Sequence, residues 1–172
     1  MIVSLITTLV LISNIAFIFH IPLFFGNGQF RNRHINFIRR HILVLTFLLS
    51  LLATAGSLIF SNVIGFAPCE LCWFQRIFMF PIAIVSFIAL LRKEKQITLY
   101  ILWLAIFGGI VALYQSLVNW GFNSSLLGCT AAGGECAKVY VNAYGYITIP
   151  FMSLSAFVYI ITVSLVYLYG KE

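Results

Sequence analysis

The sequence predicts an all-α, polytopic membrane protein, built as a four-helix bundle with one extra transmembrane helix at its N-terminal side. Of the 172 residues, 62% are hydrophobic and only 8% are charged, whereas a soluble domain carries about 25% charged residues. Five apolar stretches each approach the roughly 20 residues that span a bilayer. The basic residues gather between these stretches, and no repeat or linker divides the chain. We therefore expect one integral membrane domain over residues 1–172.

The first predicted span covers Ile2 to Phe25 and contains no lysine or arginine. A secretory signal would have a basic start, a shorter apolar core and a small-residue cleavage site. The stretch is therefore predicted to be a retained transmembrane helix. The next segment, Gly26 to His41, is expected to be a polar turn. Its arginines indicate a topology signal with some attraction to anionic membrane lipid, in preference to nucleic acid.

Three further spans are predicted at 42–64, 72–91 and 97–118, with small or helix-bending residues inside them. Small residues let helices approach closely in lipid; they are Ala53, Ala55, Gly56 and Ser57 in one span, and Ala105, Gly108, Gly109 and Ala112 in another. Pro81 is expected to kink its helix. Such a kink either opens a slot for a flat ligand or serves packing alone.

The segment from 119 to 148 is the one long loop that the sequence predicts. It holds Cys129 and Cys136 among several glycines, so we expect this pair to be mobile and wet. The fifth span follows at 149–169, with Pro150 tolerated in its first turn.

The distribution of charge predicts the orientation. With five spans, eight of the ten lysines and arginines fall on one side of the membrane and two, Arg76 and Lys138, on the other. Positive charge stays in the cytoplasm, so the N-terminus is expected outside and the C-terminus in the cytoplasm. Both cysteine pairs then lie on the outer face of the cell membrane, where disulfides persist.

Cys69, Cys72 and Arg76 form the most chemically suggestive group in the chain. In a helix these residues fall at positions i, i+3 and i+7, on one face. A nearby positive charge favours the reactive thiolate, so the group is predicted to be a redox site. The alternative for Arg76 is a side chain that extends to the lipid headgroups.

Three interpretations of the four cysteines remain: a zinc site, two structural disulfides, or two redox-active pairs that exchange with each other. Six residues separate Cys129 from Cys136, and small zinc sites usually repeat the shorter spacing. A Cys-x-x-Cys disulfide stabilises little, because it closes so short a loop. Exchange between an accessible thiolate and a reachable disulfide fits the arrangement best.

The sequence resembles the bacterial disulfide bond formation protein B family in two motifs. Cys69-Glu70-Leu71-Cys72-Trp73-Phe74-Gln75-Arg76 resembles the family's C-x-L-C-W-x-Q-R, and Ile147-Thr148-Ile149-Pro150-Phe151-Met152-Ser153-Leu154 resembles the start of its last helix. The similarity covers about residues 42–169. It implies a protein-disulfide:quinone oxidoreductase of the bacterial cytoplasmic membrane. Such an enzyme reoxidises a thioredoxin-like extracytoplasmic thiol-disulfide oxidase and passes the electrons to menaquinone or ubiquinone.

The resemblance also implies a role for each matching residue. Cys129 would form the mixed disulfide with the partner, and Cys136 would be its mate. Cys69 would resolve the loop pair, Cys72 would face the quinone, and Arg76 would lie beside the quinone.

The sequence departs from the family pattern in two places. The helix over residues 2–25 is extra, and Gln115 follows Tyr114 where members often have histidine. Glutamine can hydrogen-bond a quinone oxygen but cannot deliver a proton as imidazolium does, and a packing role for Gln115 is equally open.

Two alternative interpretations of the whole protein remain. One is the vitamin K epoxide reductase family, in which the two cysteine pairs occur in the opposite order, and the other is a non-enzymatic membrane protein with structural disulfides.

Overall fold

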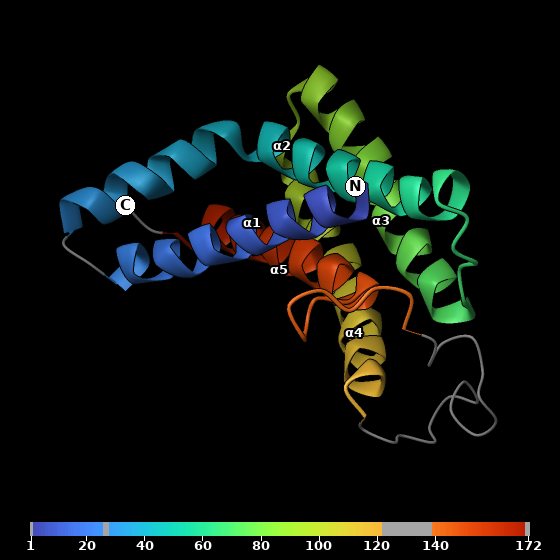
Figure 1. The fold of residues 1–172 in the computed structure, drawn as a ribbon. Coiled ribbons are helices and arrows are strands. Elements are labelled where there is room, and N and C mark those ends of the chain that lie inside the picture. Colours follow the sequence, from blue (N-terminus) through green and yellow to red (C-terminus); the bar gives the residue numbers. More distant parts are fainter. Residues whose placement is uncertain (1, 26–27, 122–138, 171–172) are drawn as a thin grey trace.

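The computed structural model describes residues 2–25, 28–121 and 139–170, and these parts of the chain form a helical bundle (Figure 1). Five long helices lie within the described residues: α1 (Ile2–Phe25), α2 (Gly28–Leu58), α3 (Glu70–Arg92), α4 (Thr98–Asn119) and α5 (Ile149–Tyr169). A π-helical turn, η1 (Ile59–Val63), continues α2, and a 3₁₀ turn, η2 (Lys95–Ile97), precedes α4. All five helices are long and apolar enough to cross a membrane. The predicted all-α polytopic fold is therefore confirmed.

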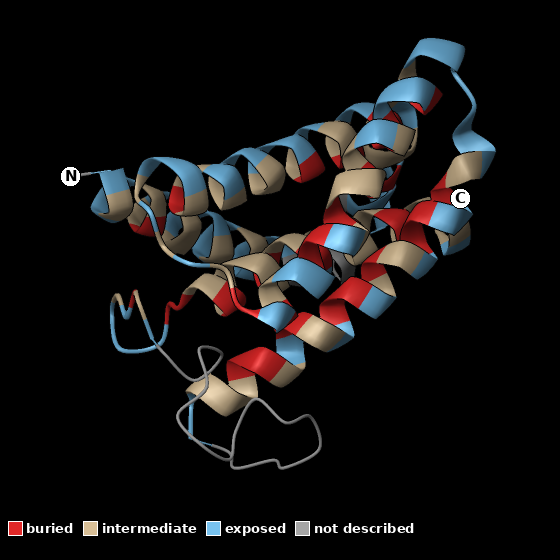
Figure 2. Ribbon diagram, turned by 90° about the vertical axis from the view of Figure 1, so that its right-hand side faces the viewer, coloured by how far each residue is buried: buried red, intermediate tan, exposed pale blue. Residues whose placement is uncertain are grey.

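Helices α2 to α5 form the packed bundle, in which α4 lies against α5 and α2 against α3. Buried residues face between the helices and exposed ones face outward (Figure 2). The predicted close contact along α4 is confirmed, because an added Cβ at Gly108 would overlap the fully buried ring of Phe157. At Gly109 an added Cβ would make ordinary contacts, the nearest at 3.5 Å. Of the two glycines of α4, Gly108 is thus the one that makes the closer approach to α5.

Helix α1 lies outside this packed bundle. It runs antiparallel to the first part of α2 and alongside α5 (Figure 1), and among the five helices it makes the fewest contacts. Most of its large apolar side chains are exposed, as expected of a helix surrounded by lipid.

The prediction of a polar turn up to His41 was wrong for residues 28–41, which form the first part of α2. The helix bends at His41, where φ is −109° and ψ is 15°. Arginine is a good helix former, and the segment has no glycine or proline after Gly28 to interrupt it. Ile35 and Ile38 stand three positions apart, and Ile35 is buried, so one face of this basic segment packs inward.

The sequence predicted that the small residues of α2 serve close packing, and this holds for only some of them. Ala53 does pack against the core. A Cβ added at Gly56, however, would meet no atom within 4 Å, so the missing side chain leaves space. Helix α3 continues through Pro81 without a break.

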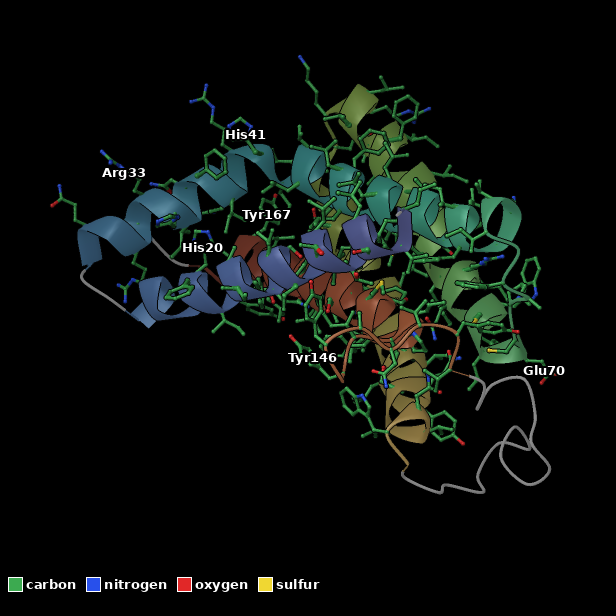
Figure 3. The ribbon with its side chains drawn as sticks, viewed as in Figure 1. His20, Arg33, His41, Glu70, Tyr146 and Tyr167 are labelled. Carbon is green, nitrogen blue, oxygen red and sulfur yellow. The ribbon has the colours of Figure 1, made fainter. Side chains whose placement is uncertain are left out.

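The two ends of the bundle differ in chemistry. His20 and Arg33 lie at one end, and Glu70, at the start of α3, lies at the other (Figure 3). The arginines of α2 and the cysteines beside Glu70 are therefore far apart.

Candidate redox site

The Cys-x-x-Cys pair lies at the N-terminus of α3. Cys69 is the N-cap residue, and Cys72 lies in the first turn, where the backbone N–H of Trp73 donates to the Cys69 carbonyl at 3.1 Å. The two Sγ atoms are 3.0 Å apart, beyond the about 2.05 Å of a disulfide bond. Little movement would convert this pair into a disulfide. The positive end of the helix dipole favours negative charge on these sulfurs.

Gln115 of α4 holds its amide against both sulfurs. Its Nε2 donates to Cys69 Sγ at 3.0 Å and to Cys72 Sγ at 3.5 Å. Gln75 of α3 donates in turn to Gln115 Oε1 at 2.6 Å, which orients the amide with its N–H groups toward the sulfurs. Gln75 and Gln115 are both buried. The pair therefore has a fixed, buried hydrogen-bond donor, and hydrogen bonds in buried surroundings are stronger than in water.

Arg76 follows one turn after Cys72 and is only 9% exposed. Its Nε donates to Ser57 Oγ and its Nη2 to the Ser57 carbonyl, each at 3.0 Å. The guanidinium also lies over the Trp73 ring, 5.2 Å from the centroid. Arg76 is thus held within the bundle, against the end of α2.

A cavity of about 600 Å³ opens beside these groups. At one end its lining is polar, with Cys69, Cys72, Gln75, Arg76 and Gln115, and elsewhere its walls are largely apolar side chains of α1, α2 and α5. Pockets of this size and composition are typical of small-molecule sites. A planar ring with two carbonyl oxygens fits the donor set, because arginine and glutamine N–H groups can bond those oxygens.

The structure brings together four of the six residues that the sequence nominated: Cys69, Cys72, Arg76 and Gln115. Cys129 and Cys136 lie outside the described residues. Asn119 and Val139, which flank that part of the chain, both line the cavity. The cavity lining therefore includes described residues close to both sides of that segment.

Sequence reasoning missed two partners of the site. Helical spacing could have identified Gln75, because it stands three residues after Cys72 and so shares its helical face. No feature of the sequence could have identified Ser57, since its contact with Arg76 depends on how α2 and α3 pack.

We expect Gln115→Leu to slow alkylation of Cys72 by iodoacetamide about tenfold or more at neutral pH. The substitution removes a donor that stabilises negative charge on sulfur, and a hydrogen bond to a charged group contributes about 1.5–3 kcal/mol. Mass spectrometry of the labelled peptide gives the rate. Ser116→Ala is the matched control, because that neighbouring hydroxyl bonds only the Ala112 carbonyl of its own helix, at 2.8 Å, among the contacts described. Equal rates in wild type and Gln115→Leu would remove Gln115 from the chemistry of the pair.

Comparison with known proteins agrees with the motifs. The family model for "Disulfide bond formation protein DsbB" matches residues 39–167. The SPbeta prophage-derived disulfide bond formation protein B of Bacillus subtilis is 38% identical over 122 residues, which cover 71% of this chain and 82% of the relative. The probable disulfide formation protein C 1 of Bacillus anthracis is 37% identical, over 71% of this chain and 88% of the relative. No solved structure matches the chain significantly. This chain is a multi-pass membrane protein that belongs to the DsbB family of disulfide bond formation proteins.

Proposed function

We propose that this disulfide-forming membrane protein is a protein-disulfide:quinone oxidoreductase, which reoxidises a thioredoxin-like extracytoplasmic oxidase and transfers the electrons to a membrane quinone. One observation carries the proposal. The Cys69–Cys72 pair, with its Gln115 donor, opens into a largely apolar cavity of about 600 Å³. A purely structural disulfide would need neither the cavity nor the buried donor.

The relay consists of two thiol–disulfide exchanges. The partner's dithiol reduces the Cys129–Cys136 disulfide, and the partner leaves oxidised. The new loop dithiol then reduces the Cys69–Cys72 disulfide and is reoxidised itself. Each exchange moves two electrons and requires a thiolate to attack a disulfide sulfur. In the second exchange Cys69 is the sulfur attacked, and Cys72 leaves as the thiolate that Gln115 stabilises.

The geometry of the chain supports contact between the two pairs. Cys136 precedes Val139 by three residues, and Val139 lines the same cavity as Cys69 and Cys72. Three extended residues span about 10 Å. The connection therefore limits Cys136 to about 10 Å from a residue of the cavity lining.

The donor set at the polar end of the cavity would hold the quinone. A bound quinone supplies an acceptor for two electrons and two protons, so the Cys69–Cys72 dithiol returns to a disulfide. Arg76 has five N–H bonds, of which Ser57 takes two, so Nη1 and the second N–H of Nη2 could donate to a carbonyl oxygen of the ring. Gln115 orients the sulfurs and does not itself supply protons. The protons would therefore come from the thiols and from solvent.

The proposed location is the bacterial cytoplasmic membrane, with both cysteine pairs facing outward. In support, Glu70 and the arginine-rich start of α2 lie at opposite ends of the bundle (Figure 3). By the positive-inside rule the arginine-rich end faces the cytoplasm.

The test is quinone reduction by the purified full-length protein, followed by absorbance, with a reduced thioredoxin-like oxidase as electron donor. Menaquinone and ubiquinone analogues are compared. We expect catalytic loss of the quinone signal and appearance of one partner disulfide for each quinone reduced. Oxidation of the partner without quinone consumption would contradict the proposed acceptor. Absence of any turnover, with all four cysteines in disulfides that resist mild reduction, would favour structural disulfides instead.

A further inference from the structure

Helix α1 lies outside the region that the family model matches, which begins at residue 39. The helix nevertheless forms part of the redox cavity. Ile6, Leu9, Val10 and Ser13 line it from one side. The cavity that begins at the thiols therefore extends to a helix that the aligned part of the family does not contain.

Polar contacts fix α1 over this cavity. The Tyr159 hydroxyl of α5 donates to Asn14 Oδ1 and lies 3.3 Å from Ser13 Oγ. The Phe17 ring packs on the Tyr159 ring, with centroids 4.6 Å apart. Asn14 is about 18 Å along the helix from Ile2, near the middle of a roughly 30 Å hydrocarbon core. Polar pairs at this depth hold helices together, because lipid offers no alternative partner.

The opposite wall leaves space for a ligand. Gly56 of α2 lines the cavity, and an added Cβ there would meet nothing within 4 Å. Leu52 and Ala53 lie beside it in the lining, and Ala156 faces them from α5. Between the thiols and α1 the walls are thus mainly aliphatic, with the Ser13 and Tyr159 hydroxyls engaged in holding α1.

We propose that α1 completes a channel for the prenyl tail of the quinone, and so contributes to selection of a long-tailed lipid substrate. The inference rests on the proposed function and adds the subsite. The polar end of the cavity suits the quinone ring, whereas the wall formed by α1, α2 and α5 suits a chain of methyl-branched isoprene units. Without α1 this part of the channel would be open to acyl chains, which compete for the same apolar surface.

The first test is Val10→Trp, which narrows the channel from the α1 side. The measurement is the ratio of KM for an analogue with several prenyl units to KM for the same ring without a tail. We expect the ratio to rise about tenfold, the effect of losing about two buried methylene groups. Ile12→Trp is the matched control, since Ile12 lies on the same helix but is not among the residues that line the cavity. Equal ratios in the two variants would overturn the inference.

The second test does not depend on turnover, so a poorly folded variant cannot confuse it. Wild-type protein is irradiated with a quinone that carries a diazirine in its prenyl tail, and the labelled peptides are sequenced. We expect label on residues 6–13 that excess unlabelled long-tailed quinone displaces. Label on α2 and α5 without α1 would overturn the channel, as would α1 labelling by a diazirine phospholipid that the quinone fails to displace. If the wild type reduces no quinone at all, the proposed function itself fails.

Discussion

Cys72→Ser is expected to abolish steady-state oxidation of the partner, lowering kcat by at least about three orders of magnitude, as loss of a covalent catalytic group does. The serine hydroxyl cannot form the Cys69–Cys72 disulfide, so the loop dithiol has nothing to reduce. The loop disulfide still reacts once. Mixed with excess reduced partner, the variant should therefore oxidise one equivalent and then stop.

The wild-type protein without quinone is the matched comparison. It starts with two disulfides and should oxidise two equivalents of partner before stopping. Thiol counting after acid quenching measures how many equivalents of partner each protein oxidises before the reaction stops. Two equivalents from Cys72→Ser, or sustained turnover with quinone, would show that Cys72 takes no part in the relay.

Arg76→Ala is expected to raise the KM for quinone about 10- to 150-fold. A hydrogen bond from a charged donor contributes about 1.5–3 kcal/mol, and the guanidinium is the one cation among the described residues that line the cavity. Without quinone the variant should still oxidise two equivalents of partner, because both disulfides remain and Arg76 forms no covalent bond in either exchange. The KM is obtained from quinone reduction at saturating partner.

Two variants distinguish the proposed contact of Arg76 with the quinone from its structural contact with Ser57. Ser57→Ala removes the hydroxyl that Arg76 Nε contacts at 3.0 Å but leaves the guanidinium in place, so the KM should change little. Arg76→Lys keeps the charge without the planar fork and should recover part of the loss. A KM that rises equally in Ser57→Ala and Arg76→Ala would mean that Arg76 acts only by holding α2 against α3.

Most of the fold could be predicted from the sequence, because a bilayer imposes a fixed length of apolar chain. The last helix has the predicted bounds, 149–169, and Thr148 caps it by accepting from the Phe151 N–H at 3.4 Å. The shared face of Cys72 and Arg76 also follows from helical spacing alone. These features depend on local sequence, so no knowledge of the neighbouring helices was needed.

The features that escaped prediction depend on contacts between helices. The basic segment 28–41 is helical because one of its faces packs inward, which its charge conceals. Gly56 opens a cavity where small residues suggested close packing, since the same composition suits both. The contacts of Gln75 and Ser57 emerge only when α2, α3 and α4 are brought together, and the contact of Gln115 with both sulfurs depends on the same packing.

Because a π-helical turn follows Ser57, the geometry of the site depends on how many residues lie between Ser57 and Cys69 as well as on which residues they are. Residues 59–63 make a wider turn than an α-helix does, and this turn begins two residues after Ser57, whose carbonyl Arg76 bonds. Deleting one residue there would restore α-helical geometry and rotate everything that follows by about 100°. Phe60 and Phe66, which line the cavity, would then turn away from it. An insertion or deletion between Ser57 and Cys69 is therefore expected to displace the cavity lining, so the length of this part of the chain is constrained as well as its composition.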